Sequence, residues 1–147
     1  MPHVLIASDA PWVHDDVVSS LPGGDVSVRS LTSGRAVRAA VGEKQPDLVV
    51  LDFQIGNMGG MATCLDLRNE ESGGRLGHVP VLLLLDRQAD VFLAQQSHAE
   101  GWLVKPLDPI RIRKAVTALL AGGTYVDRVQ TGDAATNYRA TPDSTAR

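Results

Sequence analysis

One stretch of this sequence constrains the fold more than any other. Residues 46–52 contain four consecutive apolar residues that lead into Asp52, and the glycine-rich segment 56–60 follows. A short apolar run bounded by a proline and glycines is typical of a strand buried on both faces of a parallel sheet. We therefore expect Asp52 at the carboxyl end of a central strand, which is the edge where open α/β sheets bind their ligands.

Strand-like and helix-like segments alternate along the rest of the chain. Short apolar or alternating runs predict strands at residues 3–7, 25–31, 48–51, 79–85 and 101–104. Apolar residues at helical spacing predict one helix after each strand, with Asp86 and Asp108 as caps of the last two. The predicted fold is a doubly wound (βα)5 flavodoxin-like α/β three-layer sandwich, with a parallel sheet of strand order 2-1-3-4-5.

The composition indicates an ordinary globular domain. Hydrophobic residues make up 44% of the 147 residues and charged residues 21%, and this length suits one domain. We expect that domain to span residues 1–121. Residues 122–147 contain few large apolar side chains, so we expect a disordered tail in which only Tyr125 and Val126 pack locally.

Charge, cysteine content and hydropathy argue against several classes of protein. The net charge of −3 provides no basic surface for nucleic acid or anionic membranes. The single cysteine, Cys64, rules out an internal disulfide and a paired-cysteine metal site. The longest apolar run, residues 81–85, is too short to cross a bilayer, and the N-terminus shows no secretion signal. We therefore expect a cytoplasmic protein.

Charged residues end three of the predicted strands: Asp9 the first, Asp52 the third and Lys105 the fifth. In the predicted order the carboxyl ends of strands one and three are neighbours. Two carboxylates placed there repel each other unless a divalent cation lies between them, and Mg²⁺ suits this position because it accepts carboxylate, water and phosphate oxygens. The backbone carbonyl of Gln54 is a candidate further ligand. Lys105 is then placed to contact an anion on Asp52.

A carboxylate between a metal ion and an ammonium group is equipped to receive a phosphoryl group. Aspartyl phosphate is an established covalent intermediate, and in-line transfer requires mainly positioning and charge neutralisation. An ordinary ion pair at the sheet edge explains the same spacing equally well, because structural ion pairs also lie in clefts. The residues by themselves leave both interpretations open.

Four pieces of the sequence carry a resemblance to a known family. They are Asp9 after the first strand, residues 47–61 (DLVVLDFQIGNMGGM), residues 79–85 (VPVLLLL) and residues 101–109 (GWLVKPLDP). Over residues 3–121 the chain resembles the CheY-like receiver domain of two-component response regulators. The resemblance implies that Asp52 is the phosphoacceptor and Lys105 the phosphate partner. It also implies that Asp9 is a Mg²⁺ ligand and that Trp102 occupies the switch aromatic position.

Three positions are unusual for that family. Ser8 stands where receivers usually carry a first acidic residue. Leu85 stands where the fourth strand usually ends in a serine or threonine, whose hydroxyl bonds the phosphoryl group. Asp86 follows, and its charge would repel a phosphoryl group if the side chain pointed inward. We predict an atypical receiver that keeps the acceptor residues while its relay from Leu85 to Trp102 is weakened.

The leading functional hypothesis is a stand-alone receiver, without a DNA-binding domain, for two-component signal transduction. It would accept a phosphoryl group on Asp52 from a histidine kinase and signal by contact with an unknown downstream protein. A homodimer through the face formed by the fourth helix, fifth strand and fifth helix is a further expectation. Enzymatic activity would be at most self-phosphotransfer and autodephosphorylation at Asp52.

Two alternatives compete with this hypothesis. The first is a pseudo-receiver, a protein-interaction module that works without phosphorylation. Leu85 and Asp86 favour it, whereas Asp9, Asp52 and Lys105 oppose it. The second is a flavodoxin-like protein that binds a small molecule. Treatment with Mg²⁺ and a small phosphodonor separates the receiver from the pseudo-receiver, because only the receiver is modified.

Overall fold

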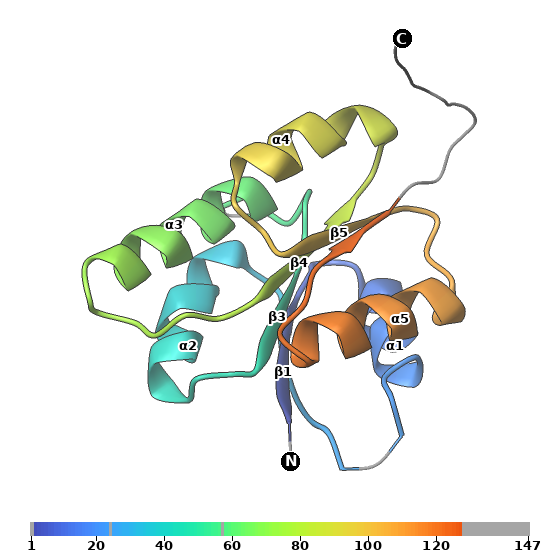
Figure 1. The fold of residues 1–147 in the computed structure, drawn as a ribbon, viewed down its shortest axis with the longest axis horizontal. Coiled ribbons are helices and arrows are strands. Elements are labelled where there is room, and N and C mark those ends of the chain that lie inside the picture. The colour runs from blue at the N-terminus through green and yellow to red at the C-terminus, as the bar shows by residue number, and fades with distance from the viewer. Residues whose placement is uncertain (1, 24, 57, 128–147) are drawn as a thin grey trace, which may run out of the picture.

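A parallel sheet of six strands forms the centre of the described fold (Figure 1). The structure, a computed structural model, describes residues 2–23, 25–56 and 58–127. The strands are β1 (His3–Ala7), β2 (Ser27–Leu31), β3 (Leu48–Asp52), β4 (Val81–Leu85), β5 (Gly101–Val104) and β6 (Tyr125–Val126). Their order in the sheet is β2-β1-β3-β4-β5-β6. The order of the first five strands and their parallel pairing confirm the predicted doubly wound fold.

Helices cover both faces of the sheet. They are α1 (Pro11–Ser19), α2 (Val37–Glu43), α3 (Gly60–Ser72), α4 (Val91–Gln96) and α5 (Pro109–Leu120). The short 3₁₀ turns η1 (Gly34–Ala36) and η2 (Gln88–Asp90) lead into α2 and α4. α1 and α5 lie on one side of the sheet and α2, α3 and α4 on the other, which gives the predicted three layers (Figure 1).

The central strands separate two hydrophobic cores, because successive residues of a strand face opposite sides of the sheet. In β3, Leu48 and Val50 pack in the core with α1 and α5, whereas Val49 and Leu51 pack with α2, α3 and α4. Every residue of β1, β3, β4 and β5 is buried. Burial on both faces explains why these strands appear in the sequence as continuous apolar runs.

The structure confirms one of the two predicted aspartate caps and contradicts the other. Asp108 caps α5 as predicted, because its carboxylate accepts a hydrogen bond from the backbone N–H of Arg111 at 2.9 Å. The prediction that Asp86 caps the fourth helix is wrong. The turn η2 begins after Arg87, and the carboxylate of Asp86 binds the ammonium group of Lys105 instead.

β6 extends the described fold beyond residue 121, the predicted end of the domain. The strand pairs with the first half of β5, in agreement with the expected local packing of Tyr125 and Val126. It satisfies backbone groups on the outer edge of β5, a long-range contact that hydropathy patterns do not indicate. The rest of the predicted tail, residues 128–147, lies outside the described residues. Among the described helices, none has the length and apolar content to span a membrane.

Candidate functional site

The side chain of Asp52 lies at the carboxyl end of β3, and only 3% of the residue is exposed. Both of its carboxylate oxygens accept hydrogen bonds. The Nζ of Lys105 donates to Oδ1 at 2.9 Å, and the hydroxyl of Ser8 donates to Oδ2 at 2.8 Å. The backbone N–H of Gln54, in the turn after β3, lies 3.4 Å from Oδ1. The fold therefore brings Asp52 and Lys105 together although they are 53 positions apart in the sequence.

The ammonium group of Lys105 is shared between two carboxylates. It donates to Oδ1 of Asp52 and to Oδ1 of Asp86, both at 2.9 Å. Burial disfavours the charged ammonium group, but its hydrogen bonds to the two aspartates outweigh this effect and raise the pKa of Lys105 above its ordinary value. Lys105 is therefore a fixed positive charge at neutral pH.

Asp86 points into the site, a direction that the sequence left open. One of its oxygens contacts Lys105, and the other is buried without a hydrogen-bond partner among the described residues. A buried carboxylate oxygen that lacks a donor is energetically unfavourable. The site thus contains an additional negative charge, which shares its counter-ion with Asp52.

The loop after β1 contributes two residues that behave differently. Ser8 is buried; its hydroxyl binds Asp52 and accepts a hydrogen bond from the backbone N–H of Ala10 at 3.1 Å. Asp9 is exposed, and its Oδ2 accepts a hydrogen bond from the backbone N–H of Gly56 at 3.1 Å. Asp9 therefore connects the loops after β1 and β3, while Ser8 occupies the interior of the site.

Leu85 and Trp102 belong to the hydrophobic core beside the site. Leu85 ends β4 and is fully buried, and Trp102 in β5 is 6% exposed. Both lie in the core that faces α2, α3 and α4. The indole N–H of Trp102 has no hydrogen-bond partner within the described part of the chain. The ring is therefore already buried, although position 85 offers it no hydroxyl group.

Trp12 is a residue of the site that the sequence pattern missed. The helical spacing of apolar residues after Asp9 includes Trp12 and indicates the packed face of a helix. In the structure Trp12 is 51% exposed, and the centroid of its ring lies 5.6 Å from Nζ of Lys105, within the range of a cation–π contact. Its place at the start of the first helix, three positions after Asp9, was the available signal.

Asp9 and Asp52 are the predicted Mg²⁺ ligands, and the structure places both at the carboxyl edge of the sheet. In the described ranges, no three histidine, cysteine, aspartate or glutamate side chains gather into a metal-binding cluster. Mg²⁺ binds through only one or two carboxylates, because water and phosphate oxygens complete its coordination shell. The oxygen chemistry of these two side chains therefore fits Mg²⁺. The part played by the Gln54 carbonyl stays a prediction.

Comparisons with known proteins relate this geometry to a family. Residues 4–117 match the family model of the response regulator receiver domain. The chain is 33% identical over 122 residues to the DNA-binding dual master transcriptional regulator RpaA of Synechocystis sp., a match that covers 82% of this chain and 49% of that protein. It is 30% identical over 119 residues to the DNA-binding response regulator MtrA of Mycolicibacterium smegmatis, covering 80% and 50%. The chain thus spans about half the length of these curated relatives.

A solved structure shares the fold. The chemotaxis response regulator CheY4 of Vibrio cholerae superposes with a TM-score of 0.71 at 22% identity, over 81% of this chain and 98% of that chain. The family match over residues 4–117 includes every residue of the site described above. Phosphorylation on an aspartate is the general function of such domains, and a histidine kinase is the partner that they imply. The chain therefore belongs to the receiver-domain family of two-component response regulators.

Proposed function

We propose that Asp52 is the phosphoacceptor of this receiver and that Lys105 is the partner of the phosphoryl group. The observation that supports this most strongly is the 2.9 Å contact between Nζ of Lys105 and Oδ1 of Asp52 at the carboxyl edge of the sheet. An ammonium group fixed beside the acceptor supplies a counter-charge for the oxygens of an incoming phosphoryl group. The phosphodonor in this proposal is a histidine kinase.

In the proposed reaction, an oxygen of Asp52 attacks the phosphorus of a phosphohistidine on the kinase. The O–P bond forms as the P–N bond breaks, and the electron pair of the broken bond returns to the histidine nitrogen. Oδ2 of Asp52 accepts one hydrogen bond, from Ser8, and keeps a second lone pair for the attack. Lys105 carries its charge on a flexible chain, so its ammonium group can follow the charge onto the phosphoryl oxygens.

Receiver domains generally bind Mg²⁺ at their acidic pocket. For this chain we propose Asp9 and Asp52, with the backbone carbonyl of Gln54, as the protein ligands. Asp9 keeps one oxygen outside its hydrogen bond to Gly56, and this oxygen is available for a metal ion. The chemistry that Mg²⁺ supplies when bound is neutralisation of the charge between carboxylate and phosphoryl oxygens.

Asp86 opposes phosphorylation in this proposal. A phosphoryl group on Asp52 carries up to two negative charges and has to share Lys105 with Asp86 or displace it. Repulsion between such charges in a partly buried site costs on the order of 1 kcal/mol. The protein is thus proposed to accept a phosphoryl group but to hold it less firmly than a site without this carboxylate.

A second candidate function is the phosphorylation-independent interaction module. One observation favours it: Asp52 and Lys105 already have hydrogen-bond partners within the protein. Both oxygens of Asp52 accept hydrogen bonds, and the ammonium group of Lys105 has two anionic partners without a phosphoryl group. A site of this kind holds its shape with no modification.

We also propose that the output is contact with a downstream protein in the cytoplasm and that the chain forms a homodimer. Exposed apolar side chains on α4, α5 and β6 support the predicted dimer face: Phe92 is 65% exposed, Ile110 67% and Val126 45%. β6 adds to this face by covering the outer edge of β5. Sedimentation equilibrium should show self-association that Phe92→Ser weakens. A monomer at every concentration would contradict the dimer.

The phosphoacceptor proposal is tested by incubation with Mg²⁺ and a small phosphodonor, followed by mass spectrometry of the intact protein. We expect the mass increase of one phosphoryl group in the wild type and none in Asp52→Asn. The control Asp66→Asn removes an aspartate on α3 that pairs with Arg38 at 3.3 Å, and it should be modified like the wild type. A wild type that neither binds Mg²⁺ nor is modified would leave the interaction module as the function.

A further inference from the structure

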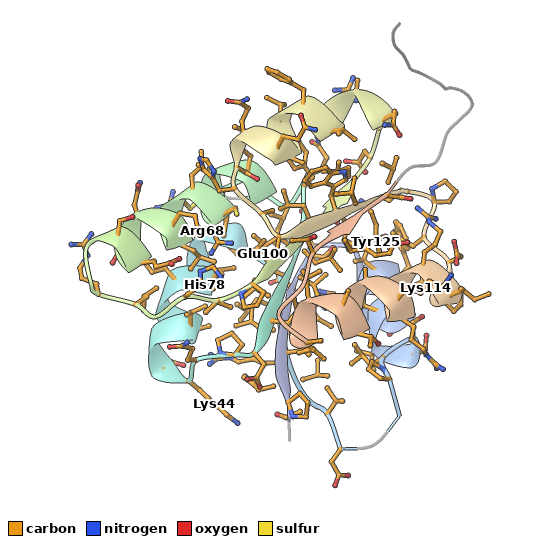
Figure 2. The ribbon with its side chains drawn as sticks, in the orientation of Figure 1. Lys44, Arg68, His78, Glu100, Lys114 and Tyr125 are labelled. Atoms are coloured by element: carbon orange, nitrogen blue, oxygen red, sulfur yellow. The ribbon has the colours of Figure 1, made fainter. Side chains whose placement is uncertain are left out.

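β6 is built closely against the edge of β5. Tyr125 pairs with Gly101 in parallel register, and its N–H donates to the carbonyl of Glu100 at 3.2 Å; Figure 2 labels both Tyr125 and Glu100. A Cβ atom at position 101 would lie 2.6 Å from the carbonyl oxygen of Tyr125. That distance is too short for any side chain, so the close approach of the two strands requires glycine at this position.

A buried carboxylate continues the contact beyond β6. Asp127 is 6% exposed, and its Oδ2 accepts a hydrogen bond from the backbone N–H of Val104 at 2.8 Å. The same oxygen pairs with the guanidinium group of Arg111 on α5. Asp127 thus fastens the end of β6 to the residue that precedes Lys105.

Arg111 in turn holds the backbone on both sides of Lys105. Its Nη2 donates to the carbonyl of Val104 at 2.8 Å, and its Nη1 donates to the carbonyl of Pro106 at 2.9 Å. A guanidinium group presents several donors in a fixed plane, so one arginine can bind two carbonyls and a carboxylate at the same time. The position of the Lys105 backbone therefore depends on Arg111, which pairs with Asp127 and also with Asp108, the cap of α5.

We propose that Arg111 and Asp127 are positioning residues for Lys105, and that through them the phosphoacceptor site and β6 influence each other. This inference rests on the proposed role of Lys105 as the partner of a phosphoryl group. The backbone that Arg111 holds fixes the point from which the Lys105 side chain reaches an anion. Coupling between two sites is reciprocal. If loosening β6 weakens anion binding by some factor, a bound anion strengthens the pairing of β6 with β5 by the same factor.

The coupling gives the site a route to the surface that bypasses position 85. The usual relay needs a hydroxyl group there, and Leu85 has none. The route through Arg111 ends at Asp127, and residues 128–147 follow directly in the sequence. A change at Lys105 is in this way transmitted to the residue that joins the receiver to the rest of the chain.

Three variants loosen β6 or its fastening without altering a side chain of the site itself. Asp127→Asn removes the charge that pairs with Arg111. Gly101→Ala drives β6 away from β5 and changes no charge. Arg111→Lys keeps the positive charge but cannot bind both carbonyls at once. The control is again Asp66→Asn, which breaks a different aspartate–arginine pair far along the chain from β6.

The first measurement is the affinity for beryllofluoride in the presence of Mg²⁺. We expect each of the three variants to lower this affinity about fivefold or more, within the usual range of coupling between sites, and the control to leave it unchanged. Circular dichroism establishes that the variants are folded. If the wild type binds and the folded variants bind equally well, the inference is overturned while the proposed function stands.

The second measurement needs no ligand. Amide hydrogen exchange at Val104 and Tyr125 is compared between the wild type and Lys105→Ala. We expect exchange about fivefold faster in the variant at these two amides, and no change in β2 at the other edge of the sheet. If the wild type fails to bind beryllofluoride, the proposed function fails, and this measurement decides the inference by itself. Unchanged exchange at both amides would overturn it.

Discussion

The two ends of the parallel strands carry charged clusters of opposite character. At the carboxyl ends, Asp52 and Asp86 share the single ammonium group of Lys105. At the amino ends of β4 and β5, an amino-end cluster is formed by Arg68, Glu71, His78 and Glu100. Figure 2 shows Arg68, His78 and Glu100 gathered beside α3. Each cluster has one carboxylate more than its lysine or arginine neutralises, and the two clusters differ in whether every carboxylate oxygen has a hydrogen-bond donor.

The amino-end cluster is also saturated with hydrogen bonds. Arg68 pairs with Glu100 and donates to the carbonyls of Val79 at 2.9 Å and His98 at 3.1 Å. His78 lies 3.0 Å from an oxygen of Glu100. These contacts join α3 to the loops before β4 and β5, and among the described residues they leave no unpartnered acceptor like that of Asp86. A cluster whose carboxylate oxygens all have partners indicates a structural role, whereas an unpartnered carboxylate oxygen indicates a site that responds to an ion.

The largest effect is expected from a substitution in the amino-end cluster. Arg68→Ala should lower the free energy of unfolding by about 3 kcal/mol, because it removes the counter-ion of Glu100 and leaves two backbone carbonyls without the guanidinium donor. Urea denaturation measures this loss. Arg75→Ala removes an exposed arginine that pairs with Glu70 at 3.0 Å, and its effect should be far smaller because solvent screens the pair. Equal losses in the two variants would show that the amino-end cluster has no special structural role.

The next prediction tests the surplus charge. Asp86→Asn should raise the affinity for beryllofluoride about fivefold to tenfold, because it removes a like charge and frees Lys105 for the anion. Its unfolding free energy should change little. Isothermal titration calorimetry with Mg²⁺ present measures the affinity, with Asp66→Asn as the control. A lower affinity would mean that Asp86 helps to hold Lys105 in its productive position.

A spectroscopic prediction sharpens the comparison further. The chain has two tryptophans, so Trp12→Phe and Trp102→Phe each leave one fluorophore. Trp12 lies beside Lys105 and is half exposed, whereas Trp102 is already buried. Addition of beryllofluoride should therefore change the emission of the Trp102→Phe variant and leave that of Trp12→Phe unchanged. The reverse result would show that the relay to Trp102 works without a hydroxyl at position 85.

The smallest effect concerns alkaline pH. The pKa of Lys105 is raised in the folded state, so its ion pairs contribute fully below about pH 10.5 and are lost as the pH rises through the folded value. The loss should be about 0.5 kcal/mol or less, because solvent screens this partly exposed group. Burial raises the pKa of the Cys64 thiol to about 11, so this thiol titrates in the same pH range. Cys64→Ala should therefore be compared with the double variant Cys64→Ala, Lys105→Met. Unfolding free energies that change equally with pH in the proteins with and without Lys105 would contradict the prediction.

The sequence predicted the frame of the site because strand ends are encoded locally. Continuous apolar runs indicate strands buried on both faces, and each run ends where a polar residue reaches the edge of the sheet. Asp9, Asp52 and Lys105 could therefore be placed at one edge before any coordinates existed. The structure brings Asp52 and Lys105 into direct contact and connects Asp9 to the loop after β3.

The rest of the site depends on side-chain directions and long-range pairing, which local patterns do not encode. The sequence allowed Asp86 to cap a helix, but a neighbouring ammonium group binds its carboxylate more strongly. Ser8 stands where the resemblance leads one to expect an acid, and its hydroxyl binds Asp52. β6 is held by a buried ion pair that joins Asp127 to Arg111, residues that no motif connects.

The short sixth strand has a consequence for behaviour at high concentration. An uncovered edge strand invites other molecules to add their own strands, which is a common start of aggregation. Here β5 is covered by a strand of only two residues, and the carboxylate of Asp127 occupies the next backbone donor. Little of the β5 backbone is left for a second molecule to pair with, so the short strand protects this edge of the sheet against edge-to-edge aggregation.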